Sequence, residues 1–108
     1  MIDLQQLRDH ARAKATHSFP LQNGKECLAG DLTGGWCGYN SVILPGNPIP
    51  QALPREWGRF LIHLNQVVGY VNPESHFTGA QVANALDRMI EGHGPEDTAD
   101  WLKEQVYG

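Results

Sequence analysis

The chain has 108 residues, of which 41% are hydrophobic, and its 12 acidic and 8 basic side chains give a formal charge of −4. This length suits one domain spanning residues 1–108, and the composition excludes wholesale disorder. No apolar run approaches the roughly 20 residues of a membrane span, so we expect no membrane association.

The first segment has the pattern of a helix that begins at Asp3. Asp3 can cap the helix, and Gln6 stands three residues later in the capping-box position. Pro20 marks its latest possible end.

Residues 1–6 lack the basic start and apolar stretch of a secretory signal, so we expect the protein to be located in the cytoplasm. In that compartment we expect the two cysteines to be free thiols.

Residues 20–54 hold six of the twelve glycines and five of the seven prolines, which makes long helices improbable. Residues 39–44 are the best strand candidate, with residues 27–32 as their antiparallel partner across a glycine turn. We therefore expect a small insert here and leave open whether it is a β-hairpin or irregular.

Three further helices follow the insert. From Pro54 an apolar face is formed by Trp57, Phe60, Leu61, Leu64, Val67, Val68 and Val71. Thr78 and Gln81 form a second capping box, and Gly92 is typical of the helix end that follows. Pro95 can open a last helix. The predicted fold is a compact, mainly α-helical domain of about four helices with the insert, the alternative being an α+β fold.

The net charge is concentrated at one end of the chain. Residues 1–90 carry seven basic and seven acidic side chains, whereas residues 91–108 carry five acidic side chains and one lysine. Residues 1–17 are slightly basic. Such asymmetry indicates either an electrostatically selected partner or attraction between the two ends.

The acidic side chains of the last helix are the first candidate site. Asp97, Asp100 and Glu104 recur at three and four residues beside Glu96, which places them roughly 5–6 Å apart on one face. Such a stripe can occupy a Lys/Arg-lined groove of another protein, including a nucleic-acid-binding surface. The alternative is a solvated outer face with helix-starting acids.

Trp101 and Tyr107 lie on the same helix and complete the predicted partner-binding set. Half-exposed tryptophan and tyrosine are preferred anchors at interfaces, although they also seal the edge of a small core. The basic side chains are too few for direct binding of nucleic acid. A homo-oligomer in which the basic first helix docks on the acidic last helix of another copy is a further possibility.

Cys37 is the candidate for an enzymatic alternative. It stands in the string Gly-Gly-Trp-Cys-Gly-Tyr-Asn-Ser at residues 34–41, which resembles the nucleophile segment of papain-like thiol hydrolases. The resemblance implies a thiol hydrolase or transferase in which a downstream histidine, His76 or His93, activates the thiol. No glutamine stands just upstream of the cysteine, and a buried thiol beside a packed tryptophan is the alternative.

We expect no metal and no cofactor, because the two cysteines stand ten positions apart and no phosphate-binding glycine motif occurs. The preferred hypothesis is a small, acidic, non-enzymatic protein-binding module that docks its last helix on a basic partner. Phage-encoded inhibitors of bacterial nucleases, including anti-CRISPR proteins, are similar to this chain in size and charge.

Overall fold

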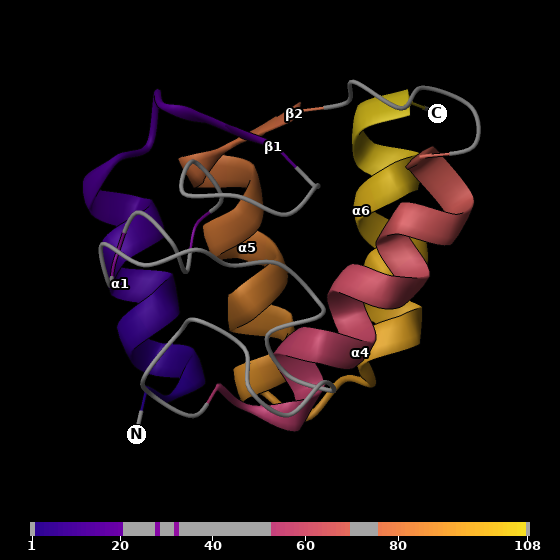
Figure 1. Cartoon of the computed structure of the whole chain (residues 1–108), viewed down its shortest axis with the longest axis horizontal. Helices are drawn as coiled ribbons and strands as arrows, with labels where there is room; N and C mark the ends of the chain where they lie inside the picture. The colour runs from indigo at the N-terminus through magenta and orange to yellow at the C-terminus, as the bar shows by residue number, and fades with distance from the viewer. Residues whose placement is uncertain (1, 21–27, 29–31, 33–52, 70–75, 108) are drawn as a thin grey trace, which may run out of the picture.

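The computed structural model describes residues 2–20, 28, 32, 53–69 and 76–107. These residues form four α-helices, one π-helical turn and two short strands: α1 (Leu4–Ala13), β1 (Ser18–Pro20), α4 (Arg55–Leu64), η1 (Asn65–Gly69), β2 (His76–Thr78), α5 (Gly79–Ile90) and α6 (Pro95–Tyr107). The protein is mainly α-helical, as the sequence predicts, and has a small β element (Figure 1). The predicted hairpin of residues 27–32 and 39–44 falls almost wholly outside the described residues.

Both predicted capping boxes are present and explain where α1 and α5 begin. Asp3 Oδ1 accepts the backbone N–H of Gln6 at 2.8 Å, and Gln6 Oε1 accepts that of Asp3 at 2.9 Å. The reciprocal bonds between Thr78 and Gln81 measure 3.2 and 2.9 Å. These side chains satisfy backbone N–H groups that have no partner within the helix.

The two strands are a feature that the sequence pattern does not reveal. β1 and β2 run antiparallel, and their register pairs Ser18 with Thr78, Phe19 with Phe77 and Pro20 with His76. Phe19 and Phe77 are both buried, so this short ladder closes one end of the core. Strands of three residues are too short for a detectable alternation of polar and apolar side chains.

The end of α1 meets the start of α5, so the two helices pack antiparallel (Figure 1). The backbone N–H of Gly79 donates to the carbonyl of His17 at 2.8 Å, and that of Ala80 donates to Ala15 at 3.0 Å. The turn after α1 therefore satisfies the first N–H groups of α5. Gly79 lies so close to α1 that an added Cβ would stand 2.1 Å from the carbonyl oxygen of Lys14.

Helices α4 and α6 form the second closely packed pair, and α5 also contacts α6. Side chains from all four helices fill the space between the two pairs. Those exposed by no more than 2% include Leu7, Trp57, Phe60, Leu64, Leu86 and Leu102. The apolar face predicted for α4 is thus a central part of the core.

Replacing Gly79 with alanine is expected to lower the free energy of unfolding by at least about 2 kcal/mol, because the new Cβ would overlap the carbonyl oxygens of Lys14 and Ala11. Urea denaturation measures the loss. Gly94→Ala is the matched control, since a Cβ there meets nothing within 4 Å and its expected effect is small. Equal stability of the two variants would contradict the close packing of α1 on α5.

Candidate functional site

The predicted acidic residues lie on α6, which begins at Pro95 as expected. The inward side of this helix consists of buried residues, namely Pro95, Thr98, Ala99 and Leu102. Glu96 and Asp97 stand in its first turn, where negative charge is favourable beside the free N–H groups of a helix start.

Glu96 is engaged by α4. Arg59 Nε donates to Glu96 Oε1 at 2.9 Å, and Arg59 Nη2 donates to Glu96 Oε2 at 3.0 Å, so the contact is bidentate. The hydrogen bonds from Arg59 hold the pKa of the Glu96 carboxyl below its usual value, against a smaller opposing effect of burial. The Glu96 side chain is 44% exposed, so solvent screens this pair.

Asp100 is engaged by α4 as well. His63 Nε2 and Asp100 Oδ1 stand 2.8 Å apart, with the side chains 27% and 59% exposed. Arg59 and His63 are four residues apart, as are Glu96 and Asp100. Because α4 and α6 run in the same direction, each pair of residues meets its counterpart in register (Figure 1).

Asp97 and Glu104 are the acidic residues that α4 does not engage. Both are exposed, and neither has a hydrogen bond or ion pair with any residue of the described segments. They stand seven residues apart, about 10.5 Å along the axis, on one side of the helix. Among the described residues, the predicted acidic set therefore divides into two paired carboxylates and two without a partner.

Trp101 lies between these two carboxylates in sequence and is half-buried against the core. The guanidinium carbon of Arg88, from α5, stands 4.7 Å from the centre of its ring, a cation–π contact that fixes the indole. Tyr107, at the end of α6, is 42% exposed and meets Phe77 edge to face at 5.8 Å. Both aromatic candidates are thus partly covered and partly available to a partner.

We call Asp97, Asp100, Trp101 and Glu104 the outer face of α6. It combines two unpaired carboxylates, one carboxylate shared with His63 and one half-buried tryptophan. Arg59 and His63 contribute to this site but were not among the residues expected there. Arg59 and His63 have the same four-residue spacing as Glu96 and Asp100. This match is the feature of the sequence that could have indicated the contact between the two helices.

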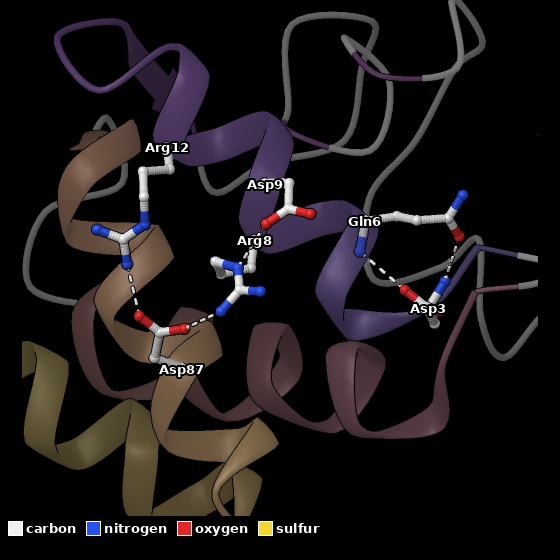
Figure 2. A network of polar contacts seen from close by, with 6 residues as sticks. All are labelled: Asp3, Gln6, Arg8, Asp9, Arg12 and Asp87. Carbon is white, nitrogen blue, oxygen red and sulfur yellow. Dashed lines mark hydrogen bonds and ion pairs between the residues drawn. The ribbon is translucent and has the colours of Figure 1, made fainter.

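The basic first helix pairs with α5, and Figure 2 shows the contacts. Asp87 accepts from Arg8 Nη1 at 2.6 Å and from Arg12 Nη2 at 2.5 Å. Hydrogen bonds to Asp87 and then Asp9 raise the pKa of the Arg8 guanidinium. Within one chain these two arginines therefore neutralise α5 rather than α6. Docking of α1 on α6 of another copy stays a prediction.

The residues of the enzymatic alternative are not brought together in the described segments. Cys37 lies outside them. His76 is the first residue of β2, before α5, whereas His93 is exposed in the turn after α5. The twelve residues of α5, about 18 Å of helix, lie between these two positions in the chain. The thiol chemistry stays a prediction.

The described residues contain no group of three or more His, Cys, Asp or Glu side chains that could hold a metal ion. A cleft of about 700 Å³ lies where the starts of α1 and α4 meet the end of α5, and Ile2, Leu53 and Met89 contribute to its apolar wall. None of the residues predicted for partner binding or thiol chemistry lines it.

No helix among the described residues is long and apolar enough to cross a membrane.

Comparison with known proteins gives no assignment. The chain matches no protein-family model, no curated protein and no solved structure. The functional proposal rests on the geometry and charge of the outer face of α6.

Replacing Glu96 with glutamine is expected to lower the free energy of unfolding by about 0.5 kcal/mol at pH ~7, the size of an exposed ion pair. Since folding lowers the pKa of this carboxyl, its contribution is present above the pKa of the unfolded chain and is lost as the pH falls through the folded value. The difference between wild type and variant should therefore shrink as the pH is lowered from ~7 toward ~3.

Urea denaturation between these two pH values measures the difference. Glu104→Gln is the control, because Glu104 is unpaired and its replacement should produce little pH-dependent change. A Glu96→Gln effect that persists undiminished at pH ~3 would contradict the role assigned to the ion pair with Arg59.

Proposed function

We propose that the chain is a small, non-enzymatic protein-binding module that docks the outer face of α6 on a basic surface of a partner protein. The observation that carries this proposal is the pair of exposed, unpaired carboxylates, Asp97 and Glu104, with the half-buried Trp101 between them. Unpaired charges beside a fixed aromatic ring favour recognition of an oppositely charged surface.

The outer face is held rigid before any partner arrives. Ala99 and Leu102 anchor α6 in the core, and an ion pair from Arg59 and a hydrogen bond with His63 attach it to α4. A prepared surface loses less conformational entropy on binding, so more of the contact energy contributes to affinity. The excess negative charge in residues 91–108 also favours electrostatic steering of a basic partner.

The spacing of the unpaired carboxylates defines the partner chemistry. Two lysine or arginine side chains about 10.5 Å apart, on either side of a site for the indole of Trp101, would complement Asp97 and Glu104. Surfaces that bind nucleic acid present basic side chains of this kind. An inhibitor that occupies such a surface in the cytoplasm, as phage-encoded anti-defence proteins do, is the more specific form of the proposal.

The test is affinity capture from a lysate of the native host with the double variant Asp97→Lys, Glu104→Lys. We expect the captured partner to bind this variant at least about tenfold more weakly than wild type, because two favourable charge contacts become repulsive. Binding of the purified partner, measured by calorimetry at two salt concentrations, gives the affinity.

Glu56→Lys with Glu91→Lys is the matched control, since it makes the same change in net charge at two exposed acidic residues outside α6. The control should capture the partner as wild type does, and the two variants should unfold at similar temperatures, because each replaces one acidic residue in the first turn of a helix. Equal capture by the α6 variant and wild type would overturn the proposed docking face.

A further inference from the structure

The two acidic residues that face α4 are neutralised by different chemistry. Glu96 meets the guanidinium of Arg59, which stays charged at every pH at which the protein folds. Asp100 meets the imidazole of His63, and histidine is the side chain that gains or loses its charge near neutral pH. The neutralisation of the Asp100 charge is therefore conditional on a proton, whereas that of the Glu96 charge is permanent.

The charged surroundings of His63 favour this conditional role. From α6 it faces Asp100 at 2.8 Å, with Glu96 one turn earlier. On its own helix Arg59 lies one turn earlier and is occupied by Glu96. The segment η1, which continues α4, contains no charged residue, and Lys103 follows Asp100 by three residues on α6. Asp100 is thus the carboxylate of α6 whose compensation by an opposite charge depends on His63.

Asp100 also belongs to the outer face. It follows Asp97 by three residues and precedes Glu104 by four, so the three carboxylates form one continuous stripe. Its side chain is 59% exposed, which leaves it accessible to a partner while it contacts His63. With His63 charged the stripe offers two uncompensated carboxylates, and with His63 neutral it offers three.

We propose that His63 regulates the outer face of α6 through its protonation, so that docking on a basic partner weakens when His63 is charged and strengthens when it is neutral. This regulation rests on the proposed docking function. Binding and protonation are linked in both directions. A cationic partner that takes over Asp100 therefore expels the proton from His63, and the complex releases protons as it forms.

The test uses octalysine as the basic probe and isothermal titration calorimetry in dilute buffer at pH ~5.5 and ~8. For wild type we expect binding about threefold weaker at the lower pH, the effect of one exposed charge pair. His63→Arg keeps the cation at both pH values, so its binding at pH ~8 should fall to the level of wild type at pH ~5.5. His63→Gln removes the cation, so most of the pH dependence should disappear.

His93→Gln is the control, because His93 is exposed in the turn just before α6 but is not paired with Asp100. This variant should keep most of the wild-type pH dependence. Repeating the titrations in buffers of different ionisation enthalpy counts the protons released. Wild type should release more than His63→Gln when binding is measured near neutral pH.

Two outcomes separate this proposal from the proposed function. If Asp97→Lys, Glu104→Lys loses octalysine binding while His63→Gln keeps the wild-type pH dependence, the outer face stands and regulation by His63 is overturned. If the same double variant binds octalysine as tightly as wild type, the outer face does not bind basic partners and both proposals fall.

Discussion

The outer face of α6 depends on the parallel packing of α6 against α4. Buried side chains such as Phe60 and Leu102 set the distance between the helices, and their common direction aligns residues of equal spacing. Arg59 and His63 consequently meet the acidic residues on the near side of α6. If the helices ran in opposite directions, the same side chains would face each other in reverse order. The parallel arrangement therefore determines that Glu96 receives the guanidinium of Arg59 and Asp100 receives the imidazole of His63.

The packing of α1 on α5, the other helix pair of the fold, explains why the excess negative charge stays on α6. Gly79 permits α5 to approach α1 closely enough for Asp87 to receive both Arg8 and Arg12. These arginines are therefore compensated within the α1–α5 pair. Folding thus directs these two arginines to Asp87 rather than to the acidic residues of α6. An acidic segment of a sequence remains an acidic surface after folding only where the basic side chains of the same chain pair with other residues.

The sequence predicts the helices well, because their causes are local. The capping boxes at Asp3 and Thr78 and the apolar face around Phe60 need only residues within a few turns of each other. The pairing of β1 with β2 could not be predicted, because Phe19 and Phe77 are brought together by packing of α1 on α5. The acidic stripe was correctly placed on one helix. Its division into paired and unpaired residues depends on which side of α6 a second helix covers, and no local pattern encodes this.

The acidic stripe on α6 is therefore graded rather than uniform, which means that its four carboxylates are neutralised to different degrees. Glu96 is neutralised permanently by a guanidinium, Asp100 conditionally by an imidazole, and Asp97 and Glu104 by no residue of the described segments. A uniform acidic face would attract any cation, since its charge alone would determine binding. A graded face favours a partner whose basic groups match the spacing of the free carboxylates and whose contact can displace one proton. Specificity of this kind comes from the neighbouring helix α4 as much as from α6 itself.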